Sequence, residues 1–421
     1  MKTPPWLDID ALIDDPRTRI IVCCGSGGVG KTTTAAAMGV RAAERGRDVV
    51  VLTVDPARRL AQSLGLSELD NTPRRIAGVG SGGTANLDAN LDNGQDVDRA
   101  GRVDVDRDGS SDGGRGGGEL HAMMLDMKRT FDEIVEAHAE PDRAEQILAN
   151  PFYQSLSSSL SGTQEYMAME KLGQLHRSGK WDLIVVDTPP SRSALDFLDA
   201  PERMGRFLDG RFIRVLMAPA RASGRLGMKV VTAGFGMFTG VLTKVLGGQV
   251  LKDVQTFVLA LDTMFGGFRE RADQTYQLLQ TPGTAFLVVA APEPDALREA
   301  SYFVDRLAEE RMPLAGLVIN RVHRISGTTL SDGLSQSRSL AAAETLDERA
   351  DHRLTAELLR LHAERMQVVA RETRLRDHFC SAHPAVRVAD IGALAEDVHD
   401  LDGLQQVAAD LADRPATASV A

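Results

Sequence analysis

The hydrophobic positions of this chain form short, continuous apolar runs that alternate with longer amphipathic stretches. Continuous apolar runs are typical of strands in a parallel sheet that is buried on both faces, and here they occupy residues 20–24, 49–54, 183–187, 285–290, 314–320 and, more weakly, 386–388. Helical periodicity predicts helices at residues 31–45, 122–138, 163–177, 296–311 and within 340–379. This alternation predicts an α/β fold in which helices flank a mostly parallel central sheet.

Two segments interrupt the alternation. Residues 78–118 are rich in Gly, Asp, Asn and Ser, and so few large apolar side chains cannot offset the entropy lost on ordering, which predicts a disordered insertion. Residues 204–268 are rich in Met, Phe, Leu and Gly, which predicts an inserted helical subdomain. The rest of the chain is assigned to one domain made of residues 1–77, 119–203 and 269–415, with residues 416–421 as a tail.

Composition narrows the class of protein. The chain has 421 residues, of which 43% are hydrophobic and 25% are charged, as in an average globular protein. Its formal net charge of -11 provides no basic field for phosphate backbones, so no nucleic-acid partner is expected. The N-terminal residues are too acidic for a secretory signal, and the uncharged segment 230–243 is shorter than the ~20 residues of a membrane helix. A cytoplasmic location with reduced cysteines is expected.

One short motif carries chemistry. Residues 25–32 match the phosphate-loop pattern G-x-x-x-x-G-K-S/T between a predicted strand and a predicted helix. The backbone N–H groups of such a loop surround phosphates, and the following helix N-terminus favours negative charge. Lys31 is expected to neutralise the β- and γ-phosphates of ATP, and Thr32 to ligate Mg²⁺. The predicted nucleotide-binding set is Gly25, Ser26, Gly27, Gly28, Val29, Gly30, Lys31, Thr32 and Thr33.

Two aspartates are expected beside this loop. Asp55 and Asp187 each follow or end a predicted strand, and the carboxyl ends of parallel strands converge where a nucleotide binds. A carboxylate there can hold Mg²⁺, directly or through water, or orient the attacking water. The alternative for each is a helix cap, since Asp is a preferred N-cap residue. We predict catalytic roles for Lys31, Asp55 and Asp187, and Mg²⁺ ligation by Thr32, Asp55 and Asp187.

These motifs resemble those of a known family. The phosphate loop, Asp55-Pro56-Ala57 and Asp187-Thr188-Pro189-Pro190 are similar to motifs of the arsenical-pump-driving and tail-anchored-protein-targeting ATPases, the ArsA-like deviant Walker-A P-loop ATPases. The similarity continues through residues 161–165, 291–293 and 318–321, which read Ser-Gly-Thr-Gln-Glu, Ala-Pro-Glu and Val-Ile-Asn-Arg. The resemblance implies the fold of a P-loop NTPase.

The resemblance also implies roles for individual residues. Nucleotide would be held at the interface of a dimer. Asp55 would lie in switch I and position the hydrolytic water, and Asp187 would lie in switch II and report the γ-phosphate. Asn320 would hydrogen-bond the adenine edge, with Pro292 and Glu293 lining the base pocket. Residues 204–268 would match a helical subdomain that forms a hydrophobic groove for a client helix in the targeting branch.

The chain departs from the family pattern at three places. Ser26 stands where the family usually has a signature lysine that reaches the partner's phosphates, so the cation must come from another residue or from a paralogous partner. The zinc-binding Cys-x-x-Cys pair of the targeting branch is absent, so no metal beyond Mg²⁺ is expected, and the three cysteines do not match the arsenic-binding set. Ser161 replaces a more frequent proline.

The sequence therefore predicts an ATP-binding and ATP-hydrolysing dimeric switch that uses Mg²⁺ and moves a hydrophobic helical subdomain. The partner would be a second copy or a paralogous ATPase, and a hydrophobic client helix or membrane protein would be handled, with peripheral contact to a membrane left open. Two alternatives remain. One is an ATP-binding regulatory subunit that does not hydrolyse ATP, and the other is a ParA- or MinD-like positioning ATPase.

Overall fold

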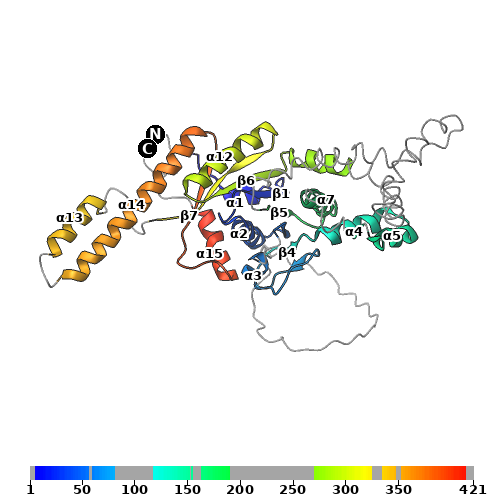
Figure 1. The fold of residues 1–421 in the computed structure, drawn as a ribbon, viewed down its shortest axis with the longest axis horizontal. Helices are drawn as coiled ribbons and strands as arrows, with labels where there is room; N and C mark the ends of the chain where they lie inside the picture. The colour runs from blue at the N-terminus through cyan, green and yellow to red at the C-terminus, as the bar shows by residue number, and fades with distance from the viewer. Residues whose placement is uncertain are drawn as a thin grey trace, which may run out of the picture.

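A computed structural model of the chain describes residues 5–55, 59–80, 117–151, 153–154, 163–189, 270–324, 334–347 and 352–413. Within these residues one eight-stranded sheet has the strand order β3-β4-β2-β5-β1-β6-β7-β8. Every neighbouring pair is parallel except β3 and β4, which are antiparallel at one edge. Helices cover the sheet, and α13 and α14 project beyond it as a pair (Figure 1). The mostly parallel α/β sheet predicted from the sequence is confirmed.

The strands are β1 (Ile20–Cys24), β2 (Val49–Thr53), β3 (Arg74–Arg75), β4 (Leu120–Met124), β5 (Leu183–Asp187), β6 (Thr284–Ala290), β7 (Leu314–Val322) and β8 (Val388–Gly392). The helices of the described residues include α1 (Ile9–Asp14), α2 (Lys31–Glu44), α3 (Arg59–Ser63), α4 (Met127–His138), α5 (Pro141–Leu148), α7 (Thr163–Arg177), α12 (Pro294–Glu309), α13 (Gln336–Asp347), α14 (Arg353–Ala382) and α15 (Leu401–Ala412). Among them, none is long and apolar enough to cross a membrane.

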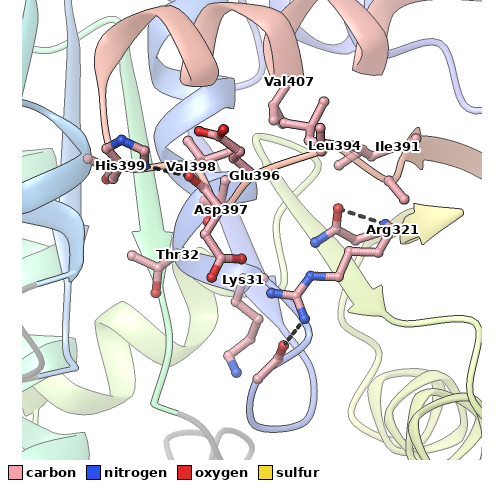
Figure 2. A pocket seen from close by; sticks show the side chains of 18 of the residues that line it. Lys31, Thr32, Arg321, Ile391, Leu394, Glu396, Asp397, Val398, His399 and Val407 are labelled. Carbon is pink, nitrogen blue, oxygen red and sulfur yellow. Dashed lines mark hydrogen bonds between the residues drawn. The ribbon is translucent and has the colours of Figure 1, made fainter.

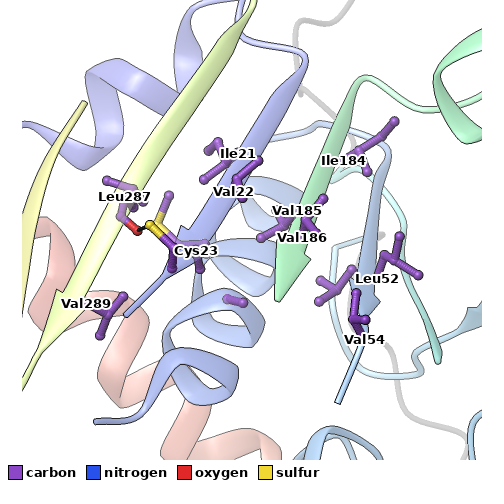
Figure 3. Packing of buried hydrophobic residues seen from close by; sticks show 14 of the residues in the cluster. Ile21, Val22, Cys23, Leu52, Val54, Ile184, Val185, Val186, Leu287 and Val289 are labelled. Carbon is purple, nitrogen blue, oxygen red and sulfur yellow. Dashed lines mark hydrogen bonds between the residues drawn. The ribbon is translucent and has the colours of Figure 1, made fainter. Parts of the chain in front are cut away.

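The central strands form the core. β1, β2, β5 and β6 are buried at every position, as their continuous apolar runs predict for a sheet covered on both faces. Figure 3 shows the side chains of these strands packed together, with Cys23 among them. The register aligns Cys23 of β1 and Thr53 of β2 with Asp187 of β5. The carboxyl ends of these three neighbouring strands therefore lie side by side.

The structure corrects one predicted helix. Periodicity placed a helix at residues 122–138, whereas residues 120–124 form β4 and the helix α4 begins at Met127. Leu120, Ala122 and Met123 are fully buried where β4 pairs with β2. Ala and Met favour helices, but pairing and burial at this edge of the sheet override that preference. The predicted helical region 340–379 is occupied by two helices, α13 and α14.

The ends of the Gly-rich segment meet at the edge of the sheet. Gly80 has a φ of +87°, and a Cβ atom there would lie 1.7 Å from the Gly118 carbonyl oxygen. A Cβ atom on Gly118 would lie 2.0 Å from the Arg47 carbonyl oxygen, and the Gly118 N–H donates to Ala43 O at 2.9 Å. This close backbone contact, called here the glycine neck, excludes any larger residue. Residues 81–116, like the predicted subdomain 204–268, lie outside the described residues.

Candidate nucleotide site

The phosphate loop connects β1 to α2 and leaves the helix N-terminus open. Gly30 is the N-cap of α2 with a φ of 92°, and no side chain of the described residues caps the helix. A Cβ atom on Gly30 would lie 2.1 Å from Asn320 Nδ2, so only glycine fits both the dihedral angle and the space. The first backbone N–H groups of α2 are therefore available to an anion, which the helix dipole also favours.

Lys31 lies at the base of this loop. It is only 5% exposed, and its Nζ donates to the Ser26 carbonyl oxygen at 2.8 Å. Burial lowers the pKa of its ammonium group, and the nearby Asp187 carboxylate opposes that effect. The loop thus holds a cation whose partner is a neutral carbonyl oxygen of the same loop, as an anion site requires.

Asp187 ends β5 beneath the loop. Its Oδ2 accepts hydrogen bonds from Thr32 Oγ1 at 2.7 Å and from Thr53 Oγ1 at 2.9 Å. Its Oδ1 is buried and has no hydrogen-bond partner among the described residues. Burial raises the pKa of this carboxyl from 3.8 to about 6, although the two threonine hydroxyls and Lys31 act in the opposite direction.

These atoms fit Mg²⁺. The ion prefers hard oxygen ligands and is usually bound by one or two protein oxygens together with phosphates and water. A hydroxyl on Thr32 and an unpartnered, buried carboxylate oxygen on Asp187 provide such ligands in one place. The predicted magnesium set is thus brought together in part, with Thr32 and Asp187 in direct contact.

Asp55 lies at the edge of the same site. It follows β2 by two residues, its N–H donates to Thr53 Oγ1 at 3.2 Å, and it lines the pocket with Lys31 and Thr32. Thr53 therefore links the backbone at Asp55 to the carboxylate of Asp187. Asp55 is partly buried and is placed beside the phosphate loop, as predicted, while its role as a catalytic group stays a prediction.

Asn320 lies behind the loop, and its amide contacts the protein. Its Nδ2 donates to Val29 O at 2.8 Å, and its Oδ1 accepts from the Arg321 N–H at 2.9 Å. Asn320 lines the pocket, but the predicted hydrogen bond to adenine stays a prediction. Pro292 and Glu293 lie at the start of α12, where Glu293 is an exposed N-cap residue, and neither is among the residues lining the pocket.

The pocket that contains the loop has a volume of about 1040 Å³. Gly28, Gly30 and Lys31 line one wall, and residues 391–399, which comprise the end of β8 and the segment leading to α15, line the other. Figure 2 shows the segment from Ile391 to His399 opposite Lys31 and Thr32, with Arg321 between the two walls. This volume is close to the upper end of the range typical of small-molecule sites.

The sequence did not point to several of these residues. Arg321, His323 and residues 391–399 line the pocket. Arg321 belongs to the family-like run 318–321 but had no predicted role, and no motif covers His323 or residues 391–399. A signal was present for residues 391–399, because ligands bind at the carboxyl ends of strands in open α/β sheets. The strand before them, β8, was predicted only weakly and two residues too early.

His323 is held by the long helix α14. Its ring nitrogen Nδ1 lies 2.7 Å from Glu372 Oε1, and its backbone N–H donates to Glu372 Oε2 at 2.8 Å. Glu372 is 8% exposed and comes from the middle of α14. The orientation of one pocket residue therefore depends on a helix that projects away from the sheet.

Comparison with known proteins agrees with this geometry. The sequence profile of the family described as anion-transporting ATPase, ArsA ATPase, matches residues 18–106 and 116–328, which is more than half of the chain. The chain belongs to the anion-transporting ATPase family. The family resemblance and the P-loop NTPase fold expected from the motifs are confirmed.

Curated relatives carry names of the same kind. The chain is 26% identical over 286 residues to a putative arsenical pump-driving ATPase 1 of Aquifex aeolicus, covering 67% of this chain and 58% of the relative. It is 26% identical over 205 residues to ATPase GET3 of Malassezia globosa, covering 49% and 48%. It is 23% identical over 322 residues to ATPase GET3 of Podospora anserina, covering 75% and 76%. The chain thus spans between about half and three quarters of these relatives.

Proposed function

We propose that this chain binds ATP with Mg²⁺ in the pocket at the carboxyl ends of β1, β2 and β5, and hydrolyses it to ADP and phosphate. The observation that carries the proposal is the pairing of an open helix N-terminus with a buried ammonium group at Lys31 and a buried carboxylate at Asp187. Membership of a family of ATPases supports it.

The residues would divide the work as their positions suggest. The loop N–H groups and Lys31 bind the β- and γ-phosphates, and Thr32 and Asp187 hold Mg²⁺. The ion, when bound, neutralises charge on the phosphate oxygens. Asp55, at the edge of the site, orients the water that attacks the γ-phosphate. The second threonine hydroxyl, on Thr53, keeps the Asp187 carboxylate turned toward the loop.

The finer proposal is a dimeric switch. Two subunits would close around bound ATP and reopen after hydrolysis, and this movement would be passed to the hydrophobic segment 204–268, which would handle a hydrophobic client helix or a membrane protein. The names of the relatives, an arsenical pump-driving ATPase and ATPase GET3, support an ATP-driven function of this general kind. The partner is a second copy of the chain or a paralogous ATPase.

One alternative is favoured by a specific observation. Ser26 contributes only its backbone carbonyl to Lys31 and brings no cation of its own to the loop. A subunit that binds ATP without hydrolysing it, and regulates a paralogous partner, would need no such cation. In that case, binding of Mg·ATP would be measurable while turnover by the chain alone would be absent.

Three measurements on the full chain test the proposal. Calorimetry with Mg·ATP tests binding, phosphate release tests hydrolysis, and light scattering with and without Mg·ATP tests dimer formation. Binding, turnover and a nucleotide-dependent doubling of mass support the switch. Binding without turnover supports the regulatory subunit. Folded protein that gives no heat with Mg·ATP contradicts both.

A further inference from the structure

The end of β7 carries an unusual backbone. The pairing of β7 with β8 shifts register between Ile319 and Val322, and within that shift Arg321 has a φ of 64°. A non-glycine residue in the left-handed region is uncommon and persists only where its surroundings hold it. Here the Arg321 N–H donates to Asn320 Oδ1, and the Asn320 amide is itself bound to the phosphate loop.

This backbone directs Arg321 toward the phosphate loop. A shift of register re-aims side chains at the end of a strand, and here Arg321 Nη1 donates to the Gly28 carbonyl oxygen at 3.3 Å. Lys31 makes the equivalent contact two residues earlier, on the Ser26 carbonyl oxygen at 2.8 Å. Two cations thus rest on alternate carbonyls of one loop, and both line the pocket (Figure 2).

The charge around the pocket sets these two residues apart. Among the described residues that line it, Lys31 and Arg321 are the two lysine or arginine residues, whereas Asp55, Glu396 and Asp397 are acidic. A guanidinium group has several N–H donors and stays charged at any working pH. The contact with Gly28 uses one of those donors, so the others remain available to phosphate oxygens.

We propose that Arg321 contacts the γ-phosphate of ATP bound in loop 25–32 of the same subunit, and that it thereby makes the site prefer a nucleoside triphosphate over a diphosphate. This inference rests on the proposed function. We assign the contact to the γ-phosphate because of where Arg321 lies. A phosphate-loop lysine reaches the β- and γ-phosphates, and Arg321 contacts the same stretch of loop as Lys31. Arg321 also supplies in this subunit the second cation that Ser26 lacks.

The test compares two nucleotides and two substitutions. Arg321→Asn removes the charge while keeping a residue that tolerates the left-handed region, and Arg321→Lys keeps the charge. Calorimetry gives the affinity for the Mg²⁺ complexes of ADP and of an ATP analogue with a β,γ-imido bridge. Arg321→Asn is expected to weaken binding of the triphosphate analogue by roughly tenfold or more, as for the loss of a charge-assisted contact, and to change ADP binding by less than about twofold. Arg321→Lys retains part of the preference.

A matched control and three contrary results complete the test. Arg298 lies on α12 with its side chain 77% exposed and paired with Asp295, so Arg298→Asn should leave both affinities unchanged. Equal losses for both nucleotides in Arg321→Asn would show that Arg321 only braces the loop, and unchanged affinities would show that it does not touch the nucleotide. Wild-type protein that binds neither nucleotide overturns the proposed function, and this inference with it.

Discussion

The two walls of the nucleotide pocket are built in different ways. The phosphate wall is formed by Gly28, Gly30, Lys31 and Thr32 of one contiguous loop, residues 25–32, with Thr53 and Asp187 fixed beside it by the register of adjacent buried strands. The opposite wall is assembled from His323 and residues 391–399, which belong to separate strands and the segments that follow them, whereas Asn320 and Arg321 contact the loop and join the two walls. The first wall depends on the core of the sheet, and the second depends on contacts between elements outside that core.

Those outer contacts are made by polar side chains. Glu372 of α14 holds His323, Arg376 of α14 donates to Asp390 Oδ2 at 2.6 Å, and Arg324 pairs with Asp410 of α15. Most of these side chains are partly exposed, so each contact contributes little by itself. The comparison teaches that nucleotide binding should be sensitive to single changes in the phosphate wall and tolerant of single changes in the opposite wall.

The largest effect is expected at Lys31. Lys31→Ala removes the buried ammonium group and should weaken Mg·ATP binding by about 100-fold or more, because a charged hydrogen bond of about 3 kcal/mol is lost. The fold should persist, since burial of Lys31 already disfavours its charged form. Calorimetry and circular dichroism check the two statements. Lys128, whose exposed side chain pairs with Asp132, provides a control in Lys128→Ala; unchanged ATP affinity in Lys31→Ala contradicts the assigned site.

Asp187→Asn should have the next largest effect. Replacing one oxygen ligand should weaken Mg²⁺-dependent ATP binding roughly 10- to 100-fold, as for other changes around metal ligands. In the wild type, binding should also weaken as the pH falls through about 6, because the carboxyl of Asp187 becomes protonated there. The variant should show no such pH dependence. Equal Mg²⁺ dependence in both proteins would show that Asp187 does not bind the ion.

Without nucleotide, the pH dependence that Asp187 gives to protein stability should run opposite to the pH dependence that it gives to ATP binding. The folded carboxyl has a pKa of about 6 against an ordinary 3.8, so the folded state binds the extra proton between these values. This contribution to stability is therefore present at low pH and is lost as the pH rises through about 6, a difference of about 3 kcal/mol. Urea unfolding at pH 5 and pH 7.5 should show a little under half of it in the wild type, about 1.4 kcal/mol. Asp187→Asn should reduce the difference, and an unchanged difference would assign it to other groups.

Asn320→Ala tests the junction of the two walls. The loss of one buried hydrogen bond, to Val29 O, should weaken binding about fivefold, corresponding to about 1 kcal/mol. If Asn320 supports the loop, inorganic tripolyphosphate and ATP should lose affinity equally. If it binds adenine, as the family resemblance implies, only ATP should lose affinity. Competition binding with both ligands separates these outcomes.

The smallest effect is expected at Glu372. Glu372→Gln keeps the shape but replaces one of the two carboxylate oxygens that contact His323, and it should weaken ATP binding about two- to threefold, the low end of the range for one hydrogen bond. Tripolyphosphate binding should not change, because His323 is not part of the phosphate loop. Glu357, exposed on the same helix, is the matched control as Glu357→Gln. A loss as large as that of Lys31→Ala would show that the comparison between the walls is wrong.

The same division explains what the sequence could predict. β1, β5 and the loop after β1 were placed at the observed residues because burial on both faces and the glycine pattern are local signals. β4 was missed because Leu120, Ala122 and Met123 become a strand only through pairing with β2. Arg321 and His323 were missed because a register shift between strands, which no local pattern encodes, directs them to the pocket.

The glycine neck has a practical consequence for the architecture. Gly80 and Gly118 touch through their backbones, and Gly118 lies just before β4, at the amino end of a strand, whereas the pocket lies at the carboxyl ends. At this edge of the sheet, the backbones at positions 80 and 118 are in direct contact. Any sequence spliced between them starts and finishes at one point, so a fluorescent or affinity tag placed there would transmit no tension to the strands and would stand on the side of the sheet opposite the bound phosphates.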